Sequence, residues 1–242
     1  MARARSDALT ATAPPGRRLS REDWHVALVL ALTLGTGAVD AVSYFSLEHV
    51  FTANMSGNMA LLGVGLATHL ADVEGNLFAF AGFVAGSVLV GRLIRAHRGP
   101  FMRTAIDALS IQLVLLVGLT VALAAVDVHA HDAARFAVCF VLAAAMGIQT
   151  GVARHLAVKD VNTTVATMTL HDLAAASRAA GGDSVRWRRR FGVVLALLVG
   201  AAIGVGLDEI VRWGGLGFTS LTVLAVIVCA VSLVRDGETE TS

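Results

Sequence analysis

The chain has 242 residues, of which 56% are hydrophobic and 15% are charged, and its formal net charge is +1. Soluble domains carry about 25% charged residues, so this composition excludes a soluble domain. A net charge close to zero gives no basic field for nucleic acid. We therefore predict an all-helical, polytopic integral membrane protein that binds no nucleic acid.

Residues 1–23 differ from the rest of the chain because they are polar, contain proline and are rich in arginine. They lack the apolar centre of a signal peptide, and Asp7, Glu22 and Asp23 argue against a transit peptide. We expect a disordered cytoplasmic tail here. A single helical membrane domain over 24–234 and a short cytoplasmic tail over 235–242 are expected to follow.

Six apolar runs are long enough to cross a hydrocarbon core, which takes about 20 residues. They are 24–46, 77–95, 104–126, 133–153, 191–211 and 215–234. Two further runs, 55–69 and 161–176, are shorter and more polar. We expect these two to be short intramembrane segments, and whether they cross or re-enter is left open.

The basic residues favour six crossings, because cytoplasmic loops of membrane proteins carry an excess of Lys and Arg. With six crossings and the N-terminus inside, 17 of the 19 basic residues lie inside, and Arg135 and Arg212 lie outside. With eight crossings the division is 12 to 7. The sequence therefore predicts that both termini are cytoplasmic and that the protein lies in a plasma (bacterial inner) membrane.

Aromatic and acidic residues agree with this orientation. An aromatic belt would place Trp24 and Trp187 at the inner interface and Tyr44 and Trp213 at the outer one. The stretches expected outside hold the acidic residues Glu48, Asp72, Glu74, Asp127, Asp132, Asp208 and Glu209.

The order of segments suggests an internal repeat. A long helix ending GTGAVDAVSYF, a polar segment FTANMSGNMALLG, a glycine-containing helix FAGFVAGSVLVG and an apolar helix are followed by a second set at an offset of about 110 to 114 residues. The second set reads AAAMGIQTGVARH, VNTTVATMTL, LALLVGAAIGVG and a final apolar helix. Each half, about 24–126 and 133–234, has three crossings, so the second copy must be inverted. Inverted repeats with broken polar segments are typical of secondary transporters.

Asp40 is the first candidate site residue, because ionisable groups inside membrane spans are costly and usually functional. It lies about 16 residues into the first helix, or roughly 24 Å from its start. That depth is near the expected outer interface, where a carboxylate costs less. A proton- or cation-linked role and a structural hydrogen bond are both open.

The amide and hydroxyl side chains of the two short segments are the other leading candidates. They are expected either to line a passage or to cap short helices and bond neighbouring backbone. Gln149 ends the fourth long span, and Gln112 lies in the third; each is expected to bond between helices. The candidates of the two short segments are Asn54, Ser56, Asn58, Asn162, Thr163, Thr164 and Thr167.

Other features have plainer interpretations. Gly82 with Gly86, and Gly200 with Gly204, are pairs that let helices approach closely, and they leave a homo-oligomer open. Cys139 and Cys229 lie in apolar sequence and are expected to pack rather than to form a disulfide or bind metal. His129 and His131 lack a supporting ligand set, so we expect no metal and no cofactor.

Two stretches carry a family resemblance. GAVDAVSYFSLEHVFTANMSGNMALLG and GIQTGVARHLAVKDVNTTVATMTL resemble the two signature regions of the YoaK family, bacterial and fungal membrane proteins of unknown function. The resemblance covers most of 25–234. The family's Met-Thr-Gly-Asn is here Met55-Ser56-Gly57-Asn58, and its second Thr-Gly pair is here Thr167-Met168. The resemblance implies a membrane fold and names no substrate.

From the residues we expect a small-solute transporter or channel, with a passage lined by the two polar segments. Its partners would be the lipid bilayer and an unidentified small solute. The alternatives are a membrane scaffold or regulator without transport, and an intramembrane enzyme. We expect that the chain is not an enzyme, because no nucleophile with a base and no metal cluster is evident.

Overall fold

The computed structural model describes residues 21–68, 72–97, 100–125, 131–156, 166–177, 180–182 and 187–239. Within these residues the fold is helical throughout and contains no strand. None of the three prolines lies inside a described helix, and Pro100 directly precedes one. The helices are α1 (Arg21–Ser46), α2 (Met55–Thr68), α3 (Val73–Ala96), α4 (Phe101–Ala125), α5 (Asp132–His155), α6 (Ala166–Ala175), α7 (Trp187–Ile210) and α8 (Gly214–Thr239).

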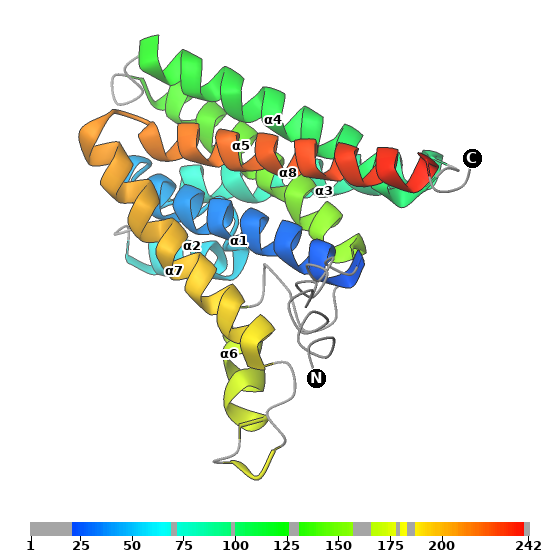
Figure 1. Ribbon diagram of the computed structural model, residues 1–242. Helices are drawn as coiled ribbons and strands as arrows, with labels where there is room; N and C mark the ends of the chain where they lie inside the picture. The colour runs from blue at the N-terminus through cyan, green and yellow to red at the C-terminus, as the bar shows by residue number, and fades with distance from the viewer. Residues whose placement is uncertain are drawn as a thin grey trace, which may run out of the picture.

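Six of these helices are long and apolar enough to cross a membrane, as predicted. Large apolar side chains such as Val114, Leu198 and Leu221 are exposed on the outside of the bundle, where a bilayer would cover them. The α1 and α5 spans are 61% buried, against 17–28% for the other four, so they form the centre of the bundle. Figure 1 shows that α1 begins and α8 ends on the same side of the bundle.

Helix α1 begins at Arg21, inside the expected tail, and α8 continues to Thr239, past the expected end of the membrane domain. Residues 1–20 lie outside the described residues, so the disordered tail stays a prediction.

Two helix pairs are interlocked by glycine, α3 with α5 and α1 with α7. A Cβ atom built at Gly82 or Gly86 of α3 would overlap the backbone carbonyl oxygen of Phe140 or Ala144 on α5. In return, a Cβ atom at Gly147 of α5 would overlap the backbone of α3. Only glycine allows helix backbones to approach this closely.

The second pair is built in the same way. A Cβ atom at Gly200 of α7 would overlap the carbonyl oxygen of Leu34 on α1, and one at Gly204 would collide with Ala38. Gly37 of α1 faces the α7 backbone at Leu197. The glycines that the sequence assigned to close helix packing therefore have that role, within the chain.

The helix contacts repeat between the two halves. When α1 is exchanged with α5, α3 with α7 and α4 with α8, the pair α3–α5 becomes α7–α1, and α4–α5 becomes α8–α1. The contacts of α4 with α8, and of α1 with α5, map onto themselves. Helix α2 packs on α3 as α6 packs on α7. This is the pairing that an inverted repeat would produce; the repeat itself stays a prediction, which this pairing supports.

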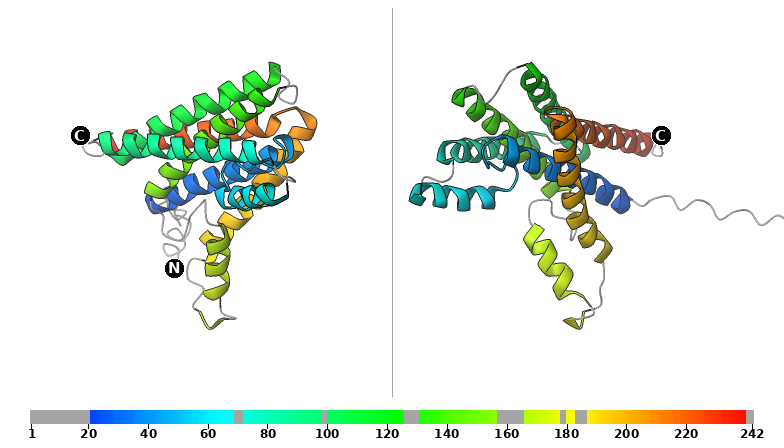
Figure 2. Two further views of the ribbon diagram at one scale, coloured as in Figure 1. Left: turned by 180° about the vertical axis from the view of Figure 1, so that it is seen from behind. Right: turned by 90° about the vertical axis from the view of Figure 1, so that its left-hand side faces the viewer.

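The two short helices lie in different places. Figures 1 and 2 show α2 alongside the bundle next to α3, whereas α6 projects away from the bundle beside the start of α7. Helix α2 is apolar, with Met59 and Leu66 exposed. In their described residues, the two short segments therefore do not come together to line one passage.

One expectation about the aromatic residues is wrong. Trp213 was expected in an outer aromatic belt, but its side chain is buried in the core. Trp213 lies in the short turn between α7 and α8 with a left-handed φ of 64°, and the turn directs its ring inward. Tyr44 is half-buried and stacks on Phe51, with ring centroids 4.8 Å apart.

The interlocked packing predicts that Gly86→Ala destabilises the protein. The added methyl group must push α3 away from the Ala144 carbonyl, and overpacking of this kind costs about 1–3 kcal/mol. Gly118→Ala on α4 is the matched control, because no atom lies within 4 Å of its Cβ position. Thermal unfolding of detergent-purified protein should show a lower Tm for Gly86→Ala and an equal or higher Tm for Gly118→Ala. Equal Tm values for the two variants would contradict close α3–α5 contact.

Candidate functional site

The Asp40 carboxylate binds the loop that follows α1. Its Oδ1 atom accepts hydrogen bonds from the backbone N–H groups of Ala53 (2.7 Å), Thr52 (3.0 Å) and Asn54 (3.4 Å). These residues precede α2, and the helix itself satisfies none of their N–H groups. A single carboxylate oxygen thus accepts the hydrogen bonds of three loop N–H groups that no helix satisfies. These bonds are charge-assisted and therefore strong.

The loop returns to a level well inside the end of α1. The backbone reverses direction at Glu48 and His49, which adopt left-handed φ angles of 52° and 68°. Residues 52–54 then lie level with Asp40, about 9 Å below Ser46 at 1.5 Å rise per residue. Non-helical backbone at such a depth must find its hydrogen-bond partners within the protein.

Asn58 holds the same loop from α2. Its Oδ1 atom accepts a hydrogen bond from the Phe51 N–H (2.9 Å), and its Nδ2 atom donates to the Phe51 carbonyl (2.5 Å). Asn54 caps α2, because its Oδ1 accepts from the Gly57 N–H (3.3 Å) and from the Ser56 hydroxyl (2.9 Å). The polar residues of the first signature therefore satisfy the backbone of the loop before α2 and the first turn of α2.

The structural alternative thus describes the first segment best. Asn58 is fully buried, whereas Asn54 and Ser56 are exposed on the outside of the bundle. Thr167 is exposed on α6, the helix that projects away from the bundle. The remaining candidates of the second segment, Asn162, Thr163 and Thr164, lie outside the described residues.

A second group of polar side chains lies between the helices at the centre. Gln149 of α5 donates from Nε2 to the Thr36 hydroxyl (2.7 Å) and to the Leu32 carbonyl (3.1 Å), both on α1. Gln112 of α4 donates from Nε2 to Oε1 of Gln149 (2.7 Å). The prediction that both glutamines bond between helices is confirmed. We call Gln112, Gln149 and Thr36 the amide cluster; each is at most 6% exposed.

In each interlocked pair, the ends where the two helices begin are also joined by ion pairs between side chains. Arg135 of α5, whose side chain is 7% exposed, pairs with Asp72 before α3 and with Glu48 (3.1 Å). Arg189 of α7 pairs with Glu22 of α1 (2.5 Å). From the sequence, Arg135, Glu48 and Asp72 were placed outside the membrane as separate charges, and Glu22 was placed in the N-terminal tail; no pairing was predicted. The position of Arg135 among the acidic residues expected outside, Glu48 and Asp72 included, was a signal for the first ion pair.

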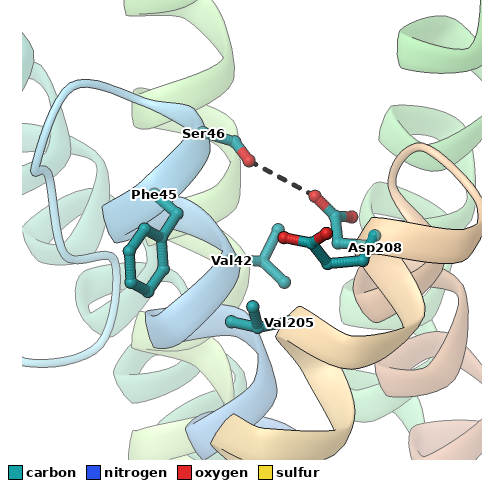
Figure 3. A pocket seen from close by; sticks show the side chains of 6 residues that line it. Val42, Phe45, Ser46, Val205 and Asp208 are labelled. Carbon is teal, nitrogen blue, oxygen red and sulfur yellow. Dashed lines mark hydrogen bonds between the residues drawn. The ribbon is translucent and has the colours of Figure 1, made fainter.

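A cavity of about 310 Å³ lies between the ends of α1 and α7, and Figure 3 shows the side chains that line it. Ser46 and Asp208 point toward one another across it, and the Ser46 hydroxyl donates to Asp208 Oδ2 (3.3 Å). Glu209 also lines the cavity, and Arg212 lies close enough to act electrostatically on Asp208. In the described part of the chain, no three His, Cys, Asp or Glu residues lie close enough together to hold a metal ion.

The loop contacts predict that Asp40→Ala destabilises the protein by about 3 kcal/mol or more, because three backbone N–H groups lose a charged acceptor. Asp40→Asn should cost less, since the amide oxygen can still accept. Unfolding by SDS titration, monitored by circular dichroism, measures both. If the two variants unfold together with the wild type, Asp40 does not hold the loop.

Comparison with known proteins agrees with this fold. A model of the family described as "Protein of unknown function (DUF1275)" matches residues 28–234. The chain is also 32% identical over 151 residues to the UPF0700 transmembrane protein YoaK of Bacillus subtilis (strain 168), a match that covers 60% of this chain and 64% of that protein. No solved structure matches the chain. The resemblance to the YoaK family is thereby confirmed, and this multi-pass membrane protein belongs to the DUF1275 family.

Proposed function

We propose that the protein is a small-solute transporter in which two rigid helix pairs, α3–α5 and α1–α7, move against each other. The observation that carries the proposal is the glycine interlock within each pair. Backbones in contact cannot slide past one another without disrupting their packing, so each pair moves as one body.

The contact between the pairs is of another kind. It runs directly through α1 and α5 over a small area, through α4 and α8, and at one end through the loop after α1, where Glu48 pairs with Arg135. The amide cluster bridges this boundary, because Gln149 reaches from α5 to Thr36 on α1. A few hydrogen bonds are easily exchanged for bonds to water or solute, which makes this boundary the place where the bundle can open.

The repeated helix pairing supports the same function. Inverted-repeat transporters work largely by rocking one helix group against another around a site near the middle of the membrane. Here the passage would run along the α1–α5 boundary. A passage lined by both short segments is not supported, since α2 and α6 lie apart.

We further propose that both termini face the cytoplasm from a plasma membrane. The 17 to 2 division of basic residues supports this orientation. The cavity at Asp208 would then face outward. The protein would act by transport rather than by catalysis.

The proposal predicts that a thiol buried at the boundary becomes accessible when the pairs separate. In a background with Cys139→Ala and Cys229→Ala, Thr36→Cys should react with a small charged methanethiosulfonate reagent in proteoliposomes. Ala79→Cys is the matched control, because Ala79 is 0% exposed on the face of α3 that carries Gly82 and Gly86. It should stay protected.

Mass spectrometry of the modified protein measures both positions. Protection of Thr36→Cys as complete as that of Ala79→Cys would contradict the proposal. A static bundle of that kind would favour a membrane scaffold.

A further inference from the structure

We propose that the amide cluster is the solute site, and that it takes a small neutral solute which donates hydrogen bonds, such as urea or a primary amide. This inference rests on the proposed transport function. It adds a place and a chemical class to it.

The first reason is an acceptor without a partner. Gln112 is 0% exposed, and its Oε1 atom receives no hydrogen bond, although its Nε2 donates to Gln149. Most hydroxyl groups in the neighbouring turns are satisfied within their own helices. Ser110 donates to the Ile106 carbonyl (2.8 Å), and Ser220 donates to the Leu216 carbonyl (2.9 Å). Burying an acceptor without a donor is unfavourable, so the position is explained if a donor occupies it during function.

The second reason is the way the cluster is ordered. The Nε2 group of Gln149 donates to the Thr36 hydroxyl and to the Leu32 carbonyl, and the Thr36 hydroxyl donates to that same carbonyl (3.0 Å). These bonds fix the Gln149 amide, so its Oε1 is presented to Gln112. The Gln112 amide is fixed in turn, and its free oxygen keeps one position. A solute that donates an N–H or O–H group would complete the series.

The third reason is charge. The three side chains of the cluster are neutral, and their hydrogen-bond partners are amides, a hydroxyl and a backbone carbonyl. Asp40 is one turn from Thr36 on α1, but its Oδ1 is occupied by three backbone N–H groups. Asp107 of α4 is 55% exposed near His97 at the inner end of the helix. An ion would enter this site without a compensating charge, whereas a neutral solute would not need one.

The cluster is closed in this structure, since its three residues are at most 6% exposed. A solute therefore reaches it only when α1 and α5 separate. Separation would break the Gln149–Thr36 bond and release further donors and acceptors to the solute. The site and the moving boundary are thus the same place.

The test is solute uptake into proteoliposomes, followed by stopped-flow light scattering. Urea is the probe, and guanidinium chloride is its charged counterpart of nearly equal size and shape. We expect wild-type protein to raise urea uptake above that of empty liposomes and to leave guanidinium uptake unchanged. Gln112→Leu should lower the protein-dependent urea rate about tenfold or more, the effect of losing one good hydrogen bond.

Ser110→Ala is the matched control on the same helix, because the Ser110 hydroxyl is already satisfied by its own helix. It should transport urea like the wild type. Gln112→Leu removes the unpaired Oε1 of Gln112 but leaves Oε1 of Gln149 without its donor, so we expect little change in stability. Tm values within error of the wild type would show that both variants fold.

The outcomes separate this inference from the proposed function. Urea uptake that survives Gln112→Leu would mean that solute passes elsewhere, and the site assignment would be overturned. If Thr36→Cys reacts but the wild type moves neither urea nor acetamide, the solute class is wrong and transport stands. If Thr36→Cys stays protected, the transport proposal itself fails.

Discussion

Contact between helix backbones at glycine is the constraint on which the structure depends. In α3–α5 and in α1–α7, a single added methyl group would collide with the backbone of the partner helix. In a bilayer there is little hydrophobic gain from bringing helices together, so close packing of this kind has to hold them. The remaining four helices are arranged around these two pairs. The α4 and α8 helices bridge them, and the short helices α2 and α6 are attached at the outside of each pair.

Polar groups follow this division. Arg135 with Asp72, and Arg189 with Glu22, join the beginnings of the two helices of each pair. Asp40 and Asn58 secure the loop that starts α2. The Arg135–Asp72 and Arg189–Glu22 ion pairs each lie within one pair. The Arg135–Glu48 ion pair and the Asp40 bonds instead link the end of α1 to the side of the bundle that carries α3 and α5. The amide cluster connects the two pairs away from their ends, directly across α1 and α5, and leaves one acceptor open. In a bilayer an unsatisfied buried group is costly. Asn76 Oδ1, Asp208 Oδ1 and Trp213 Nε1 near the helix ends also lack partners, but Gln112 Oε1 belongs to the cluster that joins the two pairs, and that position is what points to function.

The sequence predicted much of the fold, because membrane spans are read from long apolar runs and glycine spacing. The six spans and the role of Gly82, Gly86, Gly200 and Gly204 followed from such local patterns. The hydrogen-bond partners of the polar side chains could not be predicted from such patterns. Asp40 was recognised as unusual, but a loop 12 to 14 residues away binds it, and no periodicity reports such a contact.

Other parts of the site depended on contacts still more distant in the chain. Gln112 and Gln149 are 37 residues apart, and Arg135 is 63 residues from Asp72. Trp213 has the composition of a belt residue, and only the left-handed turn before α8 places it in the core. The polar segments suggested a passage because polar residues in apolar sequence often line one. In the first segment, Asn54 and Asn58 bond to neighbouring backbone instead. The cluster between the helix pairs was visible in the sequence only as two isolated glutamines.

The central claim is that two rigid pairs move relative to each other, and pulsed electron paramagnetic resonance on spin-labelled protein in nanodiscs tests it most directly. Labels at Glu74 and Ala133 lie on α3 and α5 of one pair, and labels at Glu74 and Ile210 lie on different pairs; all three residues are exposed. The account predicts one narrow distance within the pair and two distances, or one broad distribution, between the pairs. A single narrow distance for both label pairs would show one static bundle and would contradict the account.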